Sequence, residues 1–322
     1  MNEINTPKII VTRAIPTSVA KALSASFSVE FNFSDKPFTR DELKSAFQRF
    51  DGVLSTVSDN ISEDVLRIQN RRASILSNYG VGVSNIAIEY SKKIGLVVTN
   101  TPNVLTDATA EITLFLILAV SRRTSFLESK LRQQNWTGFS IVEDLGTSLN
   151  GKTLGIIGMG RIGQATARKV INSLGMRVVF FNRSPVTGLN FDAIQFNTLD
   201  EVLECSDVVS IHAPGGALSP ILSSKHFPMM KKSAFLINTA RGDVVDQHAL
   251  IYALKNNLIS GAGLDVYLNE PEVPHGLLAL NNVTLLPHVG SATNETREAM
   301  GMLAVNNLRA HFFNKNYPSR VV

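Results

Sequence analysis

The sequence predicts an α/β protein with two doubly wound, parallel-sheet domains. Short β-rich apolar runs alternate with amphipathic helical stretches from one end of the chain to the other. This alternation is typical of parallel sheets with helices on both faces. The chain has 322 residues, of which 44% are hydrophobic, so it can bury more than one compact core.

The first hundred residues predict the smaller domain. Its helical patterns, in which apolar residues recur three and four apart, include Thr39–Phe50 and Ser62–Arg71. Its candidate strands are Lys8–Thr12, Val29–Phe33, Gly52–Ser55, Ser74–Asn78 and Leu96–Thr99.

One long helix is expected next, from about Asp107 to Asn135. It contains the longest apolar run, Ile112–Val120. This run is too short to cross a bilayer and indicates a buried helix.

The second half of the chain predicts a self-sufficient domain of about six strands. These strands are Thr153–Ile157, Arg177–Phe181, Val208–His212, Ala234–Asn238, Gly261–Asp265 and Val283–Leu286. A final helix is expected over Glu295–Phe313, and we place it back against the first domain.

Composition excludes several classes of function. The single cysteine, Cys205, rules out an internal disulfide framework and a cysteine-based metal cluster, and it fits a reducing, cytoplasmic location. The net charge of +4 is spread along the chain without a basic block, so we expect no nucleic-acid partner. We expect no membrane partner and no metal site.

A glycine-rich turn provides the clearest sign of function. The strand Thr153–Ile157 runs into Gly158-Met-Gly160-Arg-Ile-Gly163, and a helix follows through Ala165–Leu174. In the Rossmann-like dinucleotide motif the glycines permit the tight turn, the approach of backbone to a pyrophosphate, and close helix–strand packing. The helix N-terminus adds free amides for the phosphates.

The residues after the next strand indicate which nicotinamide cofactor binds. NAD-binding units usually have Asp or Glu there, whereas this chain has Asn182-Arg183-Ser184. Arg183 can pair with a 2′-phosphate, and one such charge-assisted bond predicts a preference for NADPH over NADH of about ten- to a hundredfold. Alternatively, Arg183 stacks over adenine or faces water.

Three polar segments follow the later strands, at the carboxyl ends where open α/β sheets bind ligands. They are Asn238–Asp243, Leu264–Pro271 and Leu286–Ser291. Hydride transfer to a carbonyl needs an acid for the developing alkoxide, a cation for a substrate carboxylate, and a group that keeps the acid protonated.

His288, Arg241 and Glu270 suit these three tasks respectively. Histidine titrates near neutrality, the arginine fork binds two oxygens, and a carboxylate beside an imidazole favours its protonated form and fixes its tautomer. From the residues alone, a capping histidine, a surface arginine and a loop carboxylate remain open alternatives.

The motifs together resemble the D-isomer-specific 2-hydroxyacid dehydrogenases over almost the whole chain. Five of them occur in the family's order: Gly151–Gly163, Asn238–Asp243, Gly263–Val266, Asn269–Pro271 and Pro287–Ser291. The pair Asn182-Arg183 and the segment Asn100–Glu111 are most similar to the glyoxylate/hydroxypyruvate reductase branch.

The resemblance implies roles for individual residues. His288 is the proton donor, Glu270 its partner and Arg241 the substrate clamp. The amides of Val81 and Gly82 bind the substrate carboxylate, and Asp265 holds the nicotinamide carboxamide. With the glycine motif, the expected cofactor-binding set is Thr109, Gly158, Gly160, Arg161, Ile162, Gly163, Asn182, Arg183, Ser184, Pro214, Thr239, Ala240, Asp265 and Gly290.

The resemblance also implies a domain organisation. Residues 1–100 with 291–322 form a discontinuous substrate domain, and residues 101–290 form an NADP-binding domain. A homodimer is expected, in which the Asp107–Asn135 region embraces the partner. The chain departs from the family at Ser84, where Asp is frequent, and at Gly215-Gly216, which replace a bulky residue and threonine.

Three functions follow as hypotheses. The first is NADPH-dependent reduction of a small 2-oxoacid, glyoxylate or hydroxypyruvate. The second is reduction of 2-ketogluconate or another larger 2-oxoacid. The third, of another class, is a nicotinamide-sensing corepressor or scaffold on the same fold, which an added peptide-docking segment or disordered tail would favour.

Overall fold

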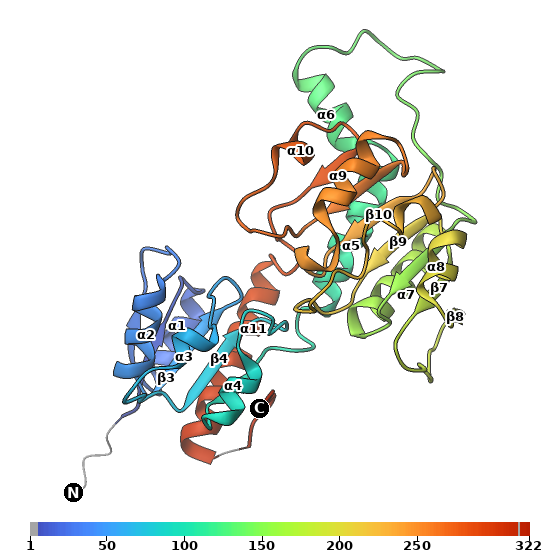
Figure 1. Ribbon diagram of the computed structural model, residues 1–322. Coiled ribbons are helices and arrows are strands. Elements are labelled where there is room, and N and C mark those ends of the chain that lie inside the picture. The colour runs from blue at the N-terminus through green and yellow to red at the C-terminus, as the bar shows by residue number, and fades with distance from the viewer. Residues whose placement is uncertain (1–5, 315) are drawn as a thin grey trace, which may run out of the picture. The chain divides into compact units, whose positions relative to one another are not determined.

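The computed structural model describes residues 6–314 and 316–322, and the chain divides into two compact units (Figure 1). One unit comprises Met1–Leu105 and Ala292–Val322, and the other comprises Thr106–Ser291. The first unit is therefore discontinuous in sequence. Which unit holds substrate and which holds cofactor stays a prediction.

The discontinuous unit contains a five-stranded sheet in the order β2-β1-β3-β4-β5, with all neighbours parallel. Its strands are β1 (Lys8–Val11), β2 (Ser28–Phe31), β3 (Gly52–Thr56), β4 (Ile75–Tyr79) and β5 (Val97–Thr99). All five lie close to the predicted ranges.

Helices cover this sheet. They are α1 (Thr17–Ser24), α2 (Arg40–Arg49), α3 (Glu63–Leu66), α4 (Ile88–Lys93) and α11 (Asn294–Arg309), which continues into the π-helical segment η3 (Ala310–Asn314). The helix α11 packs on β4 and α1, so the expectation that the last helix returns to the first domain is confirmed. The apolar side chains of α2, α3 and α4 form one core with the sheet.

One predicted helix of this unit is too long. The pattern Ser62–Arg71 predicts ten residues, but α3 ends at Leu66. Arg67 leaves helical geometry at φ −80° and ψ 66°, and Asn70 has a left-handed φ of 55°. Asparagine tolerates that conformation, so the chain turns here toward β4.

The other unit contains a seven-stranded sheet in the order β12-β11-β10-β9-β6-β7-β8, again with all neighbours parallel. Its strands are β6 (Thr153–Ile157), β7 (Arg177–Phe181), β8 (Ile194–Phe196), β9 (Val208–Ile211), β10 (Phe235–Asn238), β11 (Gly261–Leu264) and β12 (Val283–Leu285). The sequence predicted six of them. It missed β8, which has only three residues and lies at the sheet edge.

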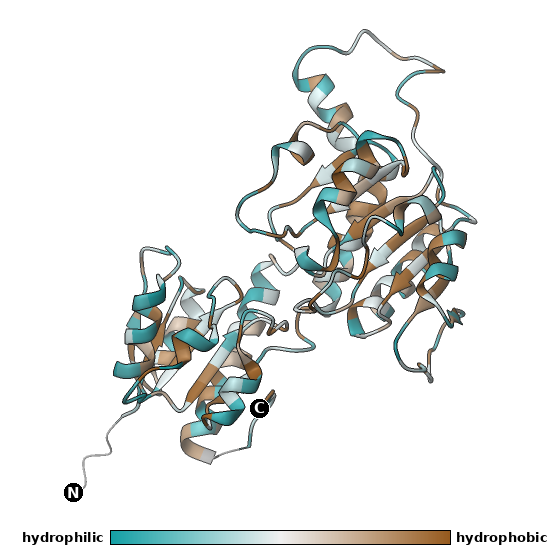
Figure 2. Ribbon diagram, in the orientation of Figure 1, coloured by the Kyte–Doolittle hydropathy of each residue, from teal (hydrophilic) through white to brown (hydrophobic). Residues whose placement is uncertain are grey.

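Two apolar layers enclose this sheet. On one face, α5 (Thr106–Ser121) and α7 (Arg161–Leu174) pack on the strands, and on the other lie α8 (Leu199–Cys205) and α9 (Gln247–Lys255). The shorter elements are η1 (Phe227–Met229), η2 (Gly242–Val244) and α10 (His275–Leu278). Figure 2 shows apolar residues concentrated along the strands. The predicted α/β architecture of two parallel-sheet domains is confirmed.

The predicted helix Asp107–Asn135 is wrong as a single element. It consists of α5 and α6 (Thr124–Arg132), separated at Arg123, which has a left-handed φ of 55°. The amide of Thr147 donates a hydrogen bond of 2.8 Å to the carbonyl of Ser121, and Gly146 lies against the same turn. A distant segment thus takes a carbonyl that a continuous helix would need. Within the part of the chain that the structure describes, no helix is long and apolar enough to cross a membrane.

Candidate active site

The glycine-rich turn joins β6 directly to α7. Gly158 has a φ of +95°, and a Cβ there would lie 2.9 Å from the backbone of His212. A Cβ on Gly163 would overlap the carbonyl oxygen of Gly158, so this glycine permits close packing of helix on turn. A Cβ on Gly160, in contrast, would meet nothing within 4 Å, so there is open space at the middle of the turn.

The N-terminus of α7 opens onto that space. The helix has fourteen residues and begins at Arg161, which Ile162 follows, so it starts earlier than the predicted stretch Ala165–Leu174. Gly160 is its N-cap, and no side chain caps it. The free first-turn amides and the positive end of the helix dipole suit a pyrophosphate. The turn and helix therefore fit a dinucleotide cofactor.

The residues expected at the adenosine end follow β7. The side-chain oxygen of Asn182 accepts a hydrogen bond of 3.3 Å from the amide of Met159, inside the glycine turn. Its side-chain nitrogen donates one of 2.9 Å to the carbonyl of Ser184. Arg183 is exposed, and no residue in the described ranges forms an ion pair with it. The guanidinium of Arg183, which has no carboxylate partner among the described residues, therefore belongs to a segment bonded to the glycine-rich turn.

The other residues expected to line the cofactor follow β9 and β10 or lie on α5. Pro214 follows β9, and Thr239 and Ala240 follow β10. The hydroxyl of Thr113 on α5 donates to the carbonyl of Thr109 and lies 2.9 Å from the hydroxyl of Thr239. This contact joins α5 to the carboxyl end of β10.

Asp265 holds the turn that follows His288. Its two carboxylate oxygens accept hydrogen bonds of 2.7 and 2.8 Å from the amides of Val289 and Gly290. Asp265 is buried, and burial raises the pKa of its carboxyl, while the two amides act in the opposite direction. The sequence missed this backbone contact, and the role of Asp265 toward the carboxamide stays a prediction.

His288 and Glu270 form a close polar pair in the candidate active site. Nδ1 of His288 lies 2.6 Å from Oε2 of Glu270, and both side chains are 33% exposed. Burial acts to raise the pKa of Glu270, but the hydrogen bond and charge of His288, with smaller contributions from the Tyr267 amide and Arg241, lower it below its usual range. Glu270 is thereby held as a carboxylate against the imidazole, as the sequence predicts for an oriented proton donor.

Tyr267 positions both members of this pair, a role that no sequence pattern indicated. Its amide donates a hydrogen bond of 3.0 Å to Oε1 of Glu270. Its hydroxyl donates one of 2.9 Å to the carbonyl of Leu286, just before Pro287-His288. Burial raises the pKa of the hydroxyl, so it remains a donor.

Arg241 follows β10, next to the strand that precedes Glu270. Its guanidinium is half-buried and donates a hydrogen bond of 2.6 Å to the carbonyl of Ala240, and none of the described residues forms an ion pair with it. Burial lowers the pKa of Arg241, and the charges of Glu270 and Asp243 oppose this effect. A half-buried guanidinium without an ion-pair partner is suited to binding the carboxylate of a ligand.

Close backbone packing brings the loops of Arg241 and Glu270 together. A Cβ on Gly242 would overlap the peptide between Tyr267 and Leu268. Since β10, β11 and β12 are neighbours in the sheet, Arg241, Glu270 and His288 lie at the carboxyl ends of three adjacent strands.

The glycine pair that replaces bulkier residues also has a structural partner. Oδ2 of Asp243 accepts a hydrogen bond of 2.5 Å from the amide of Gly216, and a Cβ on Gly215 would overlap the Asp243 carboxylate. The loop after β9 is thus tied to the loop that carries Arg241. The sequence did not reveal this contact.

The loop that contains Val81 and Gly82 follows β4 in the discontinuous unit. Side-chain amides of Asn100 and Asn78 donate hydrogen bonds of 2.9 and 3.0 Å to the carbonyls of Val81 and Gly82. No described residue accepts a hydrogen bond from the two backbone amides of Val81 and Gly82. A fixed loop with two free amides is suited to binding an anion.

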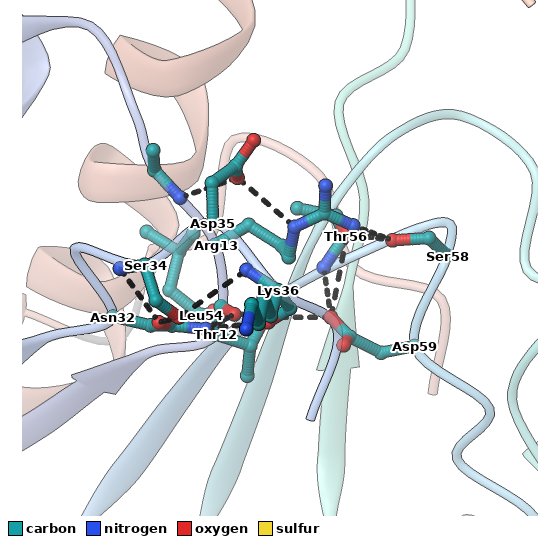
Figure 3. Close-up of polar contacts among 11 residues, drawn as sticks. Thr12, Arg13, Asn32, Ser34, Asp35, Lys36, Leu54, Thr56, Ser58 and Asp59 are labelled. Carbon is teal, nitrogen blue, oxygen red and sulfur yellow. Dashed lines mark hydrogen bonds and ion pairs between the residues drawn. The ribbon is translucent and has the colours of Figure 1, made fainter. Parts of the chain in front are cut away.

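A polar cluster orders the neighbouring loops of this unit (Figure 3). Oδ2 of the buried Asp59 accepts hydrogen bonds from the Thr12 hydroxyl at 2.6 Å and the Thr56 amide at 2.7 Å. Arg13 reaches Asp35 at 3.0 Å and Ser58 at 2.8 Å, as the dashed lines in Figure 3 show. The cluster therefore ties the loops after β1, β2 and β3 to one another.

Asn85 links this cluster to the loop of Val81 and Gly82. Its side-chain amide donates hydrogen bonds of 2.9 and 3.3 Å to the carbonyls of Asp59 and Thr56.

Among the described residues, no group of three or more His, Cys, Asp or Glu side chains is placed to hold a metal ion.

Comparisons with known proteins find similar sequences over almost the whole chain. Residues 114–290 match the family model described as D-isomer specific 2-hydroxyacid dehydrogenase, NAD binding domain. The chain is 39% identical to a glyoxylate reductase from Thermococcus litoralis over 94% of this chain and 93% of that protein. It is 38% identical to a glyoxylate reductase from Aeropyrum pernix over 98% of this chain and 96% of the relative.

A solved structure shows the same fold. It is an NADPH-dependent glyoxylate/hydroxypyruvate reductase from Sinorhizobium meliloti in complex with NADP and malonate. Its TM-score with this chain is 0.87, with 33% sequence identity, covering 98% of this chain and 97% of that one.

Proposed function

Because the chain belongs to the D-isomer-specific 2-hydroxyacid dehydrogenase family, in its glyoxylate reductase branch, we propose that it reduces a small 2-oxoacid to the D-2-hydroxyacid with NADPH. Glyoxylate and hydroxypyruvate are the proposed substrates, since the similar proteins are named for them. The observation that carries the proposal is the His288–Glu270 hydrogen bond at the strand ends that also present the unpaired Arg241.

In the proposed mechanism, the unit Thr106–Ser291 binds the cofactor, which when bound supplies the hydride. His288 donates the proton that the carbonyl oxygen needs as hydride reaches the substrate carbon. Its Nδ1 is held by Glu270, which leaves Nε2 for the substrate oxygen. The Glu270 carboxylate stabilises the charged imidazole before transfer and fixes its orientation afterwards.

The proposed partner of the substrate carboxylate in the unit Thr106–Ser291 is Arg241, which binds it through its guanidinium. The role that the resemblance implies for the amides of Val81 and Gly82 stays a prediction. Arg241 holds the substrate so that its carbonyl oxygen lies within reach of His288. Orientation of this kind lowers the barrier without adding a chemical group.

The proposed choice of NADPH depends on Arg183. An exposed arginine without an ion-pair partner, in a turn with no carboxylate, favours a 2′-phosphate. Arg183→Ala is expected to lower the ratio of kcat/KM for NADPH to that for NADH by about ten- to a hundredfold, mostly through the KM for NADPH. A wild-type ratio that favours NADH would contradict the proposal.

Turnover separates the enzyme from a cofactor-sensing scaffold. The purified chain is expected to oxidise NADPH when glyoxylate or hydroxypyruvate is added, and a panel of 2-oxoacids at limiting NADPH ranks the substrates. Binding of NADPH without turnover of any 2-oxoacid would exclude the proposed activity. A higher kcat/KM for 2-ketogluconate would assign a larger substrate.

We also propose that the protein is a homodimer that associates through α6 and the segment after it. Phe139 and Ile141 are 89% and 81% exposed, and Leu131, Trp136, Val142 and Leu145 in the same stretch are also exposed. Apolar side chains gathered on one extended segment favour a protein interface.

A further inference from the structure

The turn that carries Arg183 is held by a side chain from β8, the strand that sequence patterns missed. Gln195 lies in β8, opposite Phe180 of β7 in the parallel pairing. Its side chain is half-buried and reaches past the end of β7 to the segment Asn182–Val186.

Gln195 makes three hydrogen bonds to the backbone of this segment. Its Oε1 accepts one of 2.9 Å from the amide of Val186. Its Nε2 donates one of 3.2 Å to the carbonyl of Ser184 and a long one of 3.5 Å to the carbonyl of Asn182. The bonded groups lie on both sides of Arg183, so one carboxamide fixes the backbone from which the arginine extends.

The same turn is joined to the glycine-rich turn. Asn182 accepts a hydrogen bond from the amide of Met159 and donates one to the carbonyl of Ser184. A continuous set of hydrogen bonds therefore runs from Met159 through Asn182 and Ser184 to Gln195. It fixes the position of the Arg183 backbone relative to the residues that fit the pyrophosphate.

Such fixation matters for a residue like arginine. A free arginine side chain has about 2 kcal/mol of rotamer entropy to lose when it is ordered, and a mobile backbone adds to this cost. A turn that is already ordered reduces the entropy lost on binding, which is the general effect of preorganisation.

We propose that Gln195 is a positioning residue for cofactor selection, which orders the Asn182–Val186 turn so that Arg183 meets the 2′-phosphate of NADPH. The inference depends on the proposed role of Arg183. It adds a specificity determinant outside the motifs that the sequence displays.

A purely structural role would have a different signature. The pairing of β7 with β8 runs from Val179↔Ile194 to Phe181↔Phe196 and uses backbone groups. If Gln195 only stabilised this sheet edge, its loss would weaken both nicotinamide cofactors equally. A positioning role changes the ratio between ligands with and without the 2′-phosphate.

The test uses Gln195→Leu, which removes the hydrogen bonds and keeps most of the side-chain volume. Calorimetric titration of the wild type and the variant compares, without turnover, a ligand that has the 2′-phosphate, adenosine 2′,5′-bisphosphate, with one that lacks it, ADP. The affinity for the bisphosphate is expected to fall about five- to twentyfold, as for one or two hydrogen bonds, while that for ADP is unchanged. The NADPH:NADH ratio of kcat/KM is expected to fall by the same factor.

Two further variants control for damage to the fold. Ile194→Ala, at an exposed position on the same strand, is expected to leave both affinities unchanged. Gln195→Met has an unbranched side chain of similar length and replaces the leucine variant if thermal unfolding shows that Gln195→Leu does not fold. Equal losses for bisphosphate and ADP in the folded variant would overturn the inference.

A double-mutant cycle with Arg183→Ala separates the inference from the proposed function. If Gln195 acts through Arg183, Gln195→Leu has no further effect on the bisphosphate:ADP ratio in the Arg183→Ala background. A fall with Arg183→Ala but not with Gln195→Leu would overturn the role of Gln195 and leave the role of Arg183 intact. No fall with Arg183→Ala would refute both.

Discussion

At the scale of single residues, His288, the proposed proton donor, has an uncommon backbone conformation. Its φ of 53° lies in the left-handed region, which few non-glycine residues occupy, although asparagine, aspartate and histidine are enriched there. The Asp265 carboxylate compensates by binding the next two amides, and Tyr267 binds the carbonyl two residues before His288. Strain maintained by its surroundings is typical of functional positions.

His288→Asn tests the chemistry of this residue and spares its backbone, because asparagine tolerates the left-handed region. The kcat for reduction of glyoxylate is expected to fall about a hundred- to ten-thousandfold, the usual contribution of a positioned general acid. The Kd for NADPH, measured by titration, is expected to stay the same. The matched control is His248→Asn on the surface of the same unit. A variant as active as the wild type would remove His288 from the mechanism.

Sequence patterns single out candidate residues in short local motifs, whereas they do not reveal contacts between residues far apart in the chain. Arg241, Glu270 and His288 belong to short motifs that follow predicted strands, and the structure places Glu270 against His288. Tyr267, whose hydroxyl bonds the carbonyl of Leu286, has a partner 19 positions away, and a distance of that kind has no local pattern. Gln195 escaped notice because its strand was not predicted.

At the scale of elements, the turn between β6 and α7 contains glycines with different tasks. Gly158 and Gly163 leave no room for a side chain because backbone atoms lie against them. Gly160 has open space and an ordinary φ of −78°. The motif thus combines two glycines that packing requires with one that packing does not require, which we propose serves the approach of the cofactor.

A pair of alanine substitutions separates these tasks. Gly163→Ala is expected to destabilise the fold by about 1–3 kcal/mol, because its Cβ would overlap the carbonyl oxygen of Gly158. Gly160→Ala is expected to keep the wild-type Tm and to weaken NADPH binding. Thermal unfolding and titration with NADPH measure the two effects. A lowered Tm for Gly160→Ala together with an unchanged Tm for Gly163→Ala would contradict this assignment.

Element boundaries also show where local patterns lose their predictive value. The apolar run Ile112–Val120 correctly indicated the buried helix α5, but its end depends on Thr147, which bonds the carbonyl of Ser121. The helical periodicity of a sequence cannot predict a hydrogen bond between residues so far apart in the chain. The strands other than β8 were easier to predict, because most of them are short buried runs with their own composition.

At the scale of the whole molecule, each unit has its own core, while the exposed apolar side chains of residues 131–145 belong to neither. Removal of such side chains from water is favourable by about 25 cal/mol per Å² of apolar surface that is buried. A second copy of the chain would provide this burial, which is the basis of the proposed dimer.

The double substitution Phe139→Ser and Ile141→Ser is expected to convert a dimer into monomers, since both side chains are almost fully exposed in the single chain. Light scattering coupled to size exclusion measures the mass of the species. Phe33→Ser is the matched control, because Phe33 is 87% exposed in the discontinuous unit, outside this segment. A wild-type protein that elutes as a monomer would contradict the proposed dimer.

The helix α11 has a consequence for biosynthesis. Its side chains Ala304, Val305 and Leu308 are fully buried, and they come from the last part of the chain to cover a sheet made from the first part. A nascent chain can finish Thr106–Ser291 while β4 still lacks this cover. The unit that holds the N-terminal strands therefore completes its core only after the last helix has been synthesised, although N-terminal domains usually fold first. The strands that are synthesised first therefore stay longest without the helix that covers them. They are the segment on which chaperones are expected to act.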